Sequence, residues 1–150
     1  MRISTKGRYA LRVMIDLVQN SPDNFTKLQD IAERQNLSIK YLEGILGTLV
    51  KAKLLTGERG KAGGYKLNCD PKTCSVYDIL KTTETSVVPV SCLDEKAGKC
   101  PRMAECETYP VWEELDKIIQ GYLTSVTLDQ FVASQGTKRG KSKNPSNCGL

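Results

Sequence analysis

Six cysteines and the absence of histidine decide which chemistry this chain can perform. Three of the cysteines, Cys92, Cys100 and Cys106, follow a Cys-x7-Cys-x5-Cys pattern in a stretch with little hydrophobic periodicity. Thiolates are the soft ligands that iron–sulfur clusters and zinc select, and exposed thiols also respond to oxidants. Three interpretations of these loop cysteines therefore stay open: an iron–sulfur cluster, which we favour, a cluster-free thiol switch, and an inert or zinc-binding loop.

The other residues offer little for catalysis. Without histidine the chain cannot build a Ser-His-Asp triad, a Cys-His pair or an HExxH zinc site. No set of acid, base and nucleophile can be assembled from the remaining residue types, so we expect a protein that is not an enzyme. Cys69 and Cys74, separated by four residues around Pro71, are interpreted as packing residues.

Charge is distributed unevenly along the 150 residues. Residues 1–66 hold 12 Lys and Arg against 6 Asp and Glu, residues 67–135 hold 6 against 11, and residues 136–150 hold 4 against none. A basic amino-terminal part that precedes an acidic middle indicates that the first part meets a polyanion such as DNA.

The apolar pattern does not predict a membrane protein. No apolar run reaches the roughly 18 residues that a membrane span needs. Arg12 and Asp16 interrupt the apolar pattern of the first 20 residues, which argues against a signal peptide. We therefore expect a cytoplasmic protein, in which cysteines are better suited to metal binding or redox response than to structural disulfides.

Three amphipathic helices are predicted in the basic part. Residues 5–20 place apolar side chains at three- and four-residue spacing. Thr26 and Gln29 form a capping-box pattern that predicts the start of a short second helix. Ser38 is the expected N-cap of a third helix, whose apolar stripe begins at Leu42. Two helices joined by a turn of about four residues predict a helix-turn-helix.

A basic, glycine-rich hairpin is expected over residues 56–67. Two short extended segments flank the sequence Gly60-Lys61-Ala62-Gly63-Gly64, and glycine most readily takes the backbone angles of a tight hairpin turn. Beside a helix-turn-helix such a hairpin is a wing, and an ordinary surface hairpin is the alternative. The segment lacks the spacing and the Gly-Lys-Ser/Thr of a nucleotide-binding loop.

The second half of the chain combines a helix over residues 75–84, a long loop and a broad apolar helix. The loop at residues 86–110 holds three prolines and the loop cysteines, and its length indicates a functional segment. The following apolar stripe could complete the core or form a dimer seam. Its members are Val111, Trp112, Leu115, Ile118, Ile119, Tyr122, Leu123 and Val126.

The expected fold is therefore mainly α with a small β-hairpin wing. We assign residues 1–84 to a winged helix-turn-helix DNA-binding domain and residues 85–110 to a cysteine-bearing cluster loop. Residues 111–135 form the long dimerisation helix with a short terminal helix, and residues 136–150 form a disordered basic tail.

Several segments carry a resemblance to a known family. They read RISTKGRYA at residues 2–10, IAERQ at 31–35, YLE at 41–43 and GKAGGY at 60–65, with Trp112 further along. In this order and spacing they resemble the IscR-type winged-helix regulators, a family with IscR, NsrR and CymR, over roughly residues 1–134. The resemblance implies a homodimeric bacterial transcription factor with two winged heads on crossed long helices.

The resemblance also implies a [2Fe-2S] cluster on the loop cysteines, but the chain departs from the family pattern at the fourth ligand. IscR proteins usually supply a histidine three residues after the last cysteine, and Tyr109 stands there. NsrR-type relatives use a carboxylate of the partner's first helix, and Arg8 stands at that position. The fourth ligand therefore stays open, and the candidates are Glu105, Glu107, Tyr109, a residue of the partner chain and an external thiol. We rank a glutamate above Tyr109 because a carboxylate ionises without a large pKa shift.

A winged helix-turn-helix also predicts which residues meet DNA. The third helix would enter the major groove, where Glu43 could accept from a cytosine amino group, and the wing would reach the minor groove or its phosphates. The candidate set is Lys6, Arg8, Ser38, Lys40, Tyr41, Glu43, Arg59, Lys61, Gly63, Gly64 and Tyr65.

These observations together predict a homodimeric regulator that binds a double-stranded DNA operator. It would sense iron–sulfur status, or redox and nitrosative stress, through a [2Fe-2S] cluster on Cys92, Cys100 and Cys106, and would control genes of iron–sulfur cluster assembly. The alternative is a cluster-free repressor of cysteine metabolism of the CymR kind. Such a repressor takes its signal from a partner metabolic enzyme or from thiol oxidation.

Overall fold

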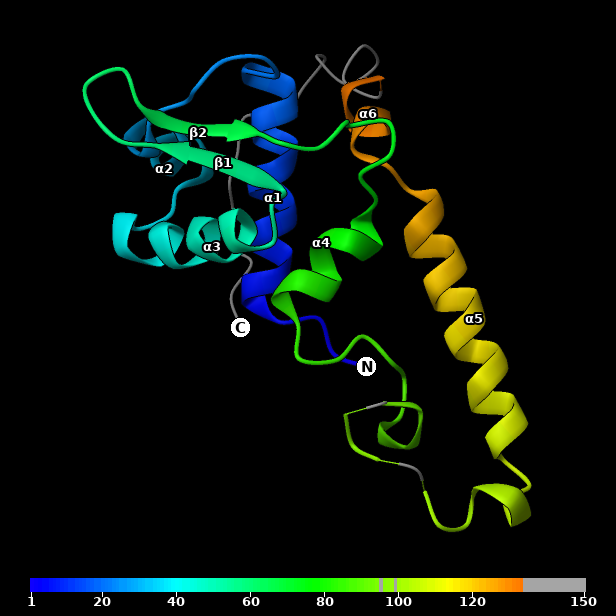
Figure 1. Cartoon of the computed structure of the whole chain (residues 1–150). Coiled ribbons are helices and arrows are strands. Elements are labelled where there is room, and N and C mark those ends of the chain that lie inside the picture. The colour runs from blue at the N-terminus through cyan, green and yellow to red at the C-terminus, as the bar shows by residue number, and fades with distance from the viewer. Residues whose placement is uncertain (95, 99, 134–150) are drawn as a thin grey trace.

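The computed structural model describes residues 1–94, 96–98 and 100–133, so the basic tail with Cys148 lies outside the described residues. The elements α1 to α4 and a two-stranded hairpin form a compact head, while α5 stands to one side of it (Figure 1). Among the described residues no helix has the length and apolar character to cross a membrane.

Three helices form the centre of the head: α1 (Thr5–Asn20), α2 (Leu28–Gln35) and α3 (Ile39–Lys51). Helix α1 begins after Ser4, whose hydroxyl accepts a hydrogen bond from the Gly7 amide at 3.0 Å. The inward faces of the three helices share one hydrophobic core, as their apolar spacing predicts. Its most enclosed side chains include Val13, Met14, Leu17, Ile31, Leu42, Ile45, Leu46 and Leu49. The predicted helix-turn-helix is confirmed.

The capping box predicted at the start of the second helix is wrong. The N-cap of α2 is Lys27, and no side chain caps the helix there. Thr26 instead pairs with Tyr65, donating its amide to the Tyr65 carbonyl at 2.9 Å and accepting from the Tyr65 amide at 2.8 Å. The pairing uses the Thr26 amide that a capping box would direct to Gln29, and the Thr26 hydroxyl is buried without a hydrogen-bond partner among the described residues.

The wing consists of β1 (Leu55–Glu58) and β2 (Gly64–Leu67), which pair antiparallel with Leu55 opposite Leu67. These two leucines are buried and attach the base of the wing to the core. Gly64 has a φ of 154°, and a Cβ there would overlap the Thr26 carbonyl. The glycine therefore lets the wing strand approach the chain that precedes α2.

The remaining elements connect the head to the outlying helix. Helix α4 (Val76–Thr83) begins with a complete capping box between Ser75 and Asp78. The loop that follows contains two single-turn 3-10 helices, η1 (Ser91–Leu93) and η2 (Met103–Glu105). It leads into α5 (Tyr109–Ser125), which packs beside α4, and then into α6 (Leu128–Ala133).

Helix α6 returns to the head and packs against α1. Leu128 is fully buried in the head's core, and its amide donates to the Cys74 carbonyl at 3.0 Å. Helix α5 thus spans the distance between the cysteine loop at its start and the head at its end.

Candidate nucleic-acid interface and cysteine loop

The first turns of α3 present the predicted DNA-contacting side chains to solvent. The Ser38 hydroxyl accepts from the Tyr41 amide at 3.3 Å, so Ser38 is the N-cap as expected. Lys40, Tyr41 and Glu43 are exposed, whereas Leu42 between them is fully buried. The buried leucine holds the helix on the head while its neighbours stay free to contact a ligand.

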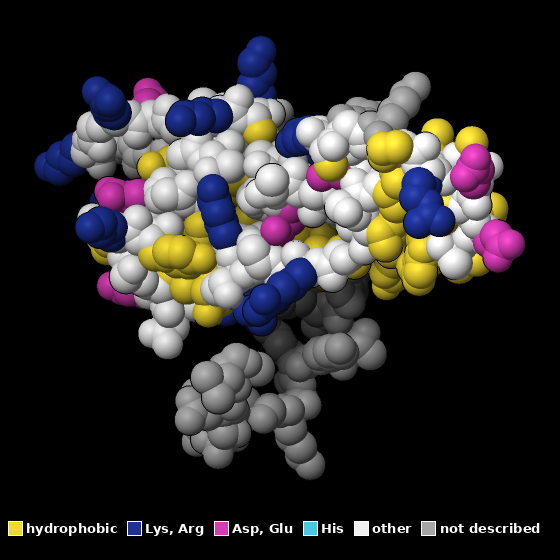
Figure 2. All heavy atoms as spheres, turned by 90° about the horizontal axis from the view of Figure 1, so that it is seen from below, with side chains coloured by type: hydrophobic (Ala, Val, Ile, Leu, Met, Phe, Trp, Pro, Cys, Tyr) yellow, Lys and Arg dark blue, Asp and Glu magenta, His cyan; other side chains and the backbone are white. Residues whose placement is uncertain are grey.

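The tip of the wing and the start of α1 are also accessible and basic. Arg59 and Lys61 are exposed at the hairpin turn, where Gly60 has a φ of 108°. Lys6 is partly exposed and Arg8 is exposed on the first turns of α1, with the Arg8 guanidinium donating to Thr5 at 3.2 Å. Figure 2 shows Lys and Arg side chains spread over the head and hydrophobic side chains gathered over the outlying helix.

A hollow of about 390 Å³ lies between the wing and the start of α2. Lys27, Lys61, Gly63 and Gly64 are among the residues that line it. A Cβ at Gly63 would overlap the Glu58 carbonyl, so this glycine is required by the turn itself. Its charged lining residues are two lysines and the carboxylate of Glu58.

The loop cysteines lie on separate parts of the loop. Cys92 is in η1, Cys106 follows η2, and all three loop cysteines are partly exposed. Among the described residues, no three Cys, Asp or Glu side chains come close enough to hold a metal ion. Glu105 and Glu107 are exposed, and Tyr109 is the first residue of α5. The thiolates and carboxylates of the loop are donor types that suit a cluster, although residues 1–94, 96–98 and 100–133 do not gather them into one ligand set.

Polar groups surround the sulfur of Cys106. Its sulfur lies 3.4 Å from the Thr108 hydroxyl. That hydroxyl holds the pKa of Cys106 below its usual value, together with the backbone amides of Thr108 and Tyr109 and the nearby charge of Arg102. Cys106 therefore has increased thiolate character, as both metal ligation and oxidation require.

Cys69 and Cys74 belong to the head and not to the loop. Cys74 is buried in the core and Cys69 packs against the same core, in agreement with the expected packing role. The Cys74 thiol donates to the Cys69 sulfur, which lowers the pKa of Cys69. The same contact, together with burial, raises the pKa of Cys74.

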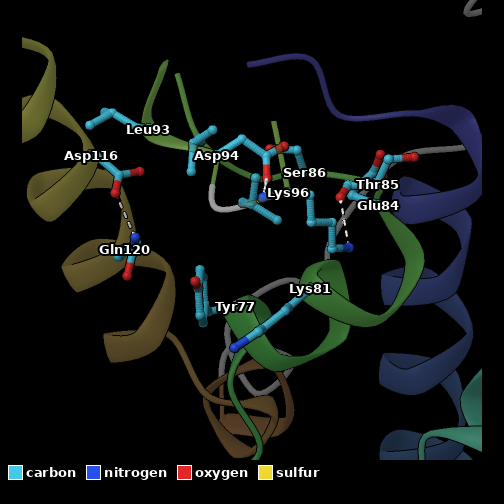
Figure 3. A pocket seen from close by; sticks show the side chains of 12 residues that line it. Tyr77, Lys81, Glu84, Thr85, Ser86, Leu93, Asp94, Lys96, Asp116 and Gln120 are labelled. Atoms are coloured by element: carbon cyan, nitrogen blue, oxygen red, sulfur yellow. Dashed lines mark hydrogen bonds between the residues drawn. The ribbon is translucent and has the colours of Figure 1, made fainter. Parts of the chain in front are cut away.

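A polar cavity of about 400 Å³ separates the cysteine loop from α4 and α5 (Figure 3). Lys81 of α4, Asp94 and Lys96 of the loop, and Asp116 and Gln120 of α5 contribute to its lining. Asp116 accepts from the Gln120 amide at 2.6 Å through one carboxylate oxygen, while its other oxygen is buried and has no hydrogen-bond partner among the residues that the structure describes. The hollow lies next to a small hydrophobic cluster in which Val87 of the loop packs with Val76 and Leu80 of α4, so only part of the loop is held against the helices by packing.

Helix α5 carries an uncovered apolar stripe. Val111, Leu115, Ile118 and Tyr122 have exposed fractions of 59%, 37%, 60% and 67%. Their spacing of four, three and four residues places them on one face of the helix. No residue of α5 is buried in the single chain. Two other members of the predicted stripe, Leu123 and Val126, pack against a second hydrophobic cluster of the same chain, formed by Val76, Leu80 and Val87. The stripe therefore helps to complete the core at its end and stays uncovered on the face of Val111, Leu115, Ile118 and Tyr122.

The winged head, the loop and the outlying helix together match a described family. A model of Rrf2, described as an iron-dependent transcriptional regulator, matches residues 3–134. The chain belongs to the Rrf2 family. A Neisseria meningitidis protein named as an HTH-type transcriptional regulator is 38% identical over 140 residues, 93% of each chain. IscR of Klebsiella pneumoniae is 35% identical over 135 residues, 90% of this chain and 82% of the relative.

Solved structures of Rrf2-type regulators have the same fold. CymR, the global cysteine regulator of B. subtilis, superposes with a TM-score of 0.72 at 33% identity, over 89% of this chain and 98% of that one. T. potens IscR superposes with a TM-score of 0.70 at 32% identity, over 96% of this chain and 94% of that one. The resemblance and the winged-helix fold inferred from sequence are confirmed, whereas the individual DNA contacts and cluster ligands stay predictions.

One set of polar residues in this Rrf2 head has a role that the sequence analysis did not find. Arg12 and Asp16 served there only to exclude a signal peptide, yet Asp16 is 4% exposed and forms an ion pair with Arg34 at 2.7 Å. The carboxylate raises the pKa of Arg34 by hydrogen bonding and by charge. The sequence does contain a signal for this network: Asp16 lies within the apolar face of α1, and a buried carboxylate requires hydrogen-bond donors around it.

Proposed function

We propose that this Rrf2-family chain is a homodimeric DNA-binding regulator whose loop cysteines hold a [2Fe-2S] cluster. The single observation that carries the proposal is the position of the loop. It joins α4 of the head to the start of α5, and α5 has an apolar face uncovered in the single chain. A change in the loop therefore acts on the element that would relate two heads to each other.

DNA recognition would use the exposed start of α3 and the wing. Ser38, Lys40 and Tyr41 would lie near phosphates or base edges of the major groove, and Glu43 would accept from a cytosine amino group. Arg59 and Lys61 would reach the minor groove or its phosphates. Gly63 and Gly64 are explained within the head itself, because a Cβ at these positions would overlap the carbonyls of Glu58 and Thr26.

Dimerisation would pair the apolar stripes of two α5 helices about a two-fold axis. The four stripe residues leave a continuous apolar face that a second copy can cover with the same residues. A two-fold dimer presents two α3 helices to two half-sites, which is how helix-turn-helix dimers bind pseudopalindromic operators.

Cluster binding would require the loop to gather its three thiols. The cavity beside the loop leaves space for this movement, and the polar surroundings of Cys106 favour the thiolate that a metal needs. Glu105, Glu107 and Tyr109 are candidates for the fourth ligand. A bound cluster would supply sensitivity to oxidants, nitric oxide and iron supply. The resemblance to the IscR-type regulators extends the proposal to genes of iron–sulfur cluster assembly as targets.

Anaerobic purification with absorption spectroscopy tests this proposal. The full chain should be coloured and should contain about two iron and two sulfide per chain. Changing Cys92, Cys100 or Cys106 to Ala should remove most of the visible absorption, whereas Cys69→Ala serves as the matched control and should keep it. A colourless protein that binds DNA tightly would contradict the cluster and leave the regulator intact.

The second candidate function is a cluster-free repressor controlled by thiol oxidation or by a partner enzyme. It is favoured by the similarity to CymR, and by the loop cysteines forming no metal-binding group within the described part of the chain. In this case DNA binding of the colourless protein should respond to peroxide or to an added metabolic enzyme, and the response to peroxide should disappear in Cys106→Ser.

A further inference from the structure

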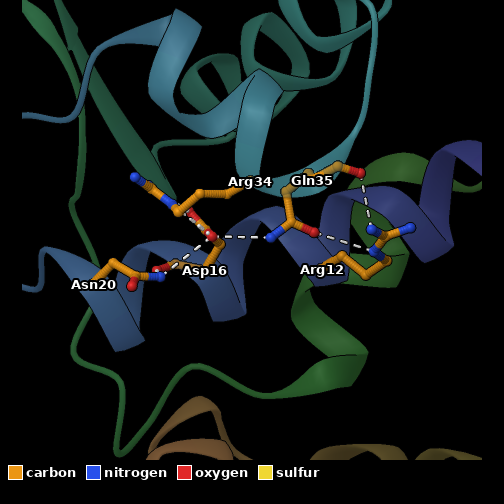
Figure 4. A network of polar contacts seen from close by, with 5 residues as sticks. All are labelled: Arg12, Asp16, Asn20, Arg34 and Gln35. Atoms are coloured by element: carbon orange, nitrogen blue, oxygen red, sulfur yellow. Dashed lines mark hydrogen bonds and ion pairs between the residues drawn. The ribbon is translucent and has the colours of Figure 1, made fainter. Parts of the chain in front are cut away.

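A buried carboxylate organises the contact between α1 and the end of α2 (Figure 4). Asp16 accepts from the Arg34 guanidinium at 2.7 to 3.1 Å, from the Gln35 amide at 2.9 Å and from the Asn20 amide at 3.2 Å. These donors satisfy a carboxylate that is 4% exposed. The contact fixes the side chain of Gln35, which lies just before the turn of the helix-turn-helix.

The orientation of the Gln35 amide is determined by its two neighbours. Its nitrogen must face Asp16, which can only accept, so its oxygen faces Arg12. The Arg12 guanidinium donates to this oxygen at 3.1 Å and to the Gln35 backbone carbonyl at 2.9 Å. Although Arg12 is exposed, two hydrogen bonds therefore hold its guanidinium in one place.

The same guanidinium supports an aromatic pair whose second ring, Tyr41, lies on α3. Its central carbon lies 5.1 Å from the centre of the Tyr9 ring. The Tyr9 ring in turn meets the Tyr41 ring edge to face, with 5.9 Å between centres and 83° between planes. Tyr41 is 39% exposed, so the contact with Tyr9 limits where its free edge can point.

We propose that Arg12 is a positioning residue for DNA recognition, which holds Tyr41 through Tyr9 while Gln35 and Asp16 hold Arg12. The inference rests on the proposed role of α3 in DNA binding. Arg12 would thus determine sequence discrimination without contacting a base. A lysine cannot replace it, because an ammonium lacks the planar fork that reaches both oxygens of Gln35.

The competing explanation is that Arg12 is an ordinary phosphate contact. The two roles differ in their effect on random DNA, because a phosphate contact strengthens binding to every sequence. The substitution Arg12→Lys keeps the positive charge, so it separates the two roles. Arg2→Lys is the matched control, since Arg2 is also an exposed arginine and takes no part in this network.

The experiment uses the full chain and a duplex that the unmodified protein selects from a randomised pool. Arg12→Lys should weaken binding to this duplex by roughly threefold to tenfold, which is the effect of losing one or two exposed polar contacts. Binding to a random duplex, and the dependence of binding on salt concentration, should stay unchanged. Gln35→Met should reproduce the loss of discrimination, and Arg2→Lys should bind like the unmodified protein.

A double-mutant cycle tests whether Arg12 acts through Tyr41. In a Tyr41→Ala background, Arg12→Lys should change binding to the selected duplex by less than about twofold, because the ring that it positions is gone. Equal losses on selected and random DNA, or full additivity in the cycle, would overturn the positioning role alone. Failure of the unmodified protein to select any sequence would overturn this inference together with DNA reading by α3.

Discussion

The apolar stripe of α5 gives the most quantitative prediction, through the substitution Ile118→Glu. Ile118 is 60% exposed in the single chain, and complete burial of an isoleucine side chain contributes about 1.5 to 3 kcal/mol. Covering the exposed part would therefore contribute about 1 to 2 kcal/mol per copy. A two-fold dimer contains the substitution twice, so the loss is about 2 to 4 kcal/mol before any cost of burying the new carboxylate.

This loss corresponds to a dimer dissociation constant that rises roughly 30-fold to 1,000-fold. Sedimentation velocity over a series of protein concentrations measures it, and circular dichroism checks that the helical content is kept. Thr124→Glu is the matched control, because Thr124 is exposed on the other side of α5 and receives the same new charge. It should remain as dimeric as the unmodified chain.

Two results would refute this reasoning. If Ile118→Glu and the unmodified chain have the same dissociation constant, the stripe is not the seam. If the unmodified chain is a monomer at every concentration, the homodimer itself is wrong, and the exposed stripe needs another partner.

Further predictions concern the head. Arg59→Ala should weaken binding to specific and random DNA alike, and should reduce the slope of log binding constant against log salt concentration by about 0.9. Glu43→Ala should instead broaden the DNA sequences that the protein accepts. Filter binding at several salt concentrations distinguishes the two effects. Alkylation followed by mass spectrometry should modify Cys69 well before Cys74, because the thiol contact lowers the pKa of the first and raises that of the second. In Cys74→Ala the rate of Cys69 alkylation should rise at a higher pH than in the unmodified chain; an unchanged pH profile would exclude the contact.

Local patterns in the sequence were sufficient for most of the helices and for the wing. The helix over residues 5–20 and the cap at Ser38 depend on side chains within a few residues, and the structure has both. The hairpin is likewise a local feature, since its glycines determine the turn. The family resemblance added the order of these elements, which no single pattern contains.

The start of the second helix could not be decided locally. Thr26 and Gln29 have the right spacing for a capping box, but Thr26 pairs with Tyr65 of the wing instead. A capping box needs the backbone amide of the threonine for the side chain of Gln29, whereas the strand pairing gives that amide to the Tyr65 carbonyl. The choice depends on a contact between residues far apart in the sequence, which local propensity does not describe.

The sequence by itself determined which residue types are present: three loop thiols, a basic amino-terminal part and an apolar stripe on one helix. Only the tertiary structure decided how they are grouped. It joined Asp16, Gln35 and Arg12 to the aromatic pair at α3. It placed the loop beside a polar cavity and, in the part of the chain that it describes, did not gather the loop cysteines into a metal-binding group. The reason is physical: periodicity reports which face of an element is buried, whereas a hydrogen bond or a metal ligand set depends on the position of another element in space.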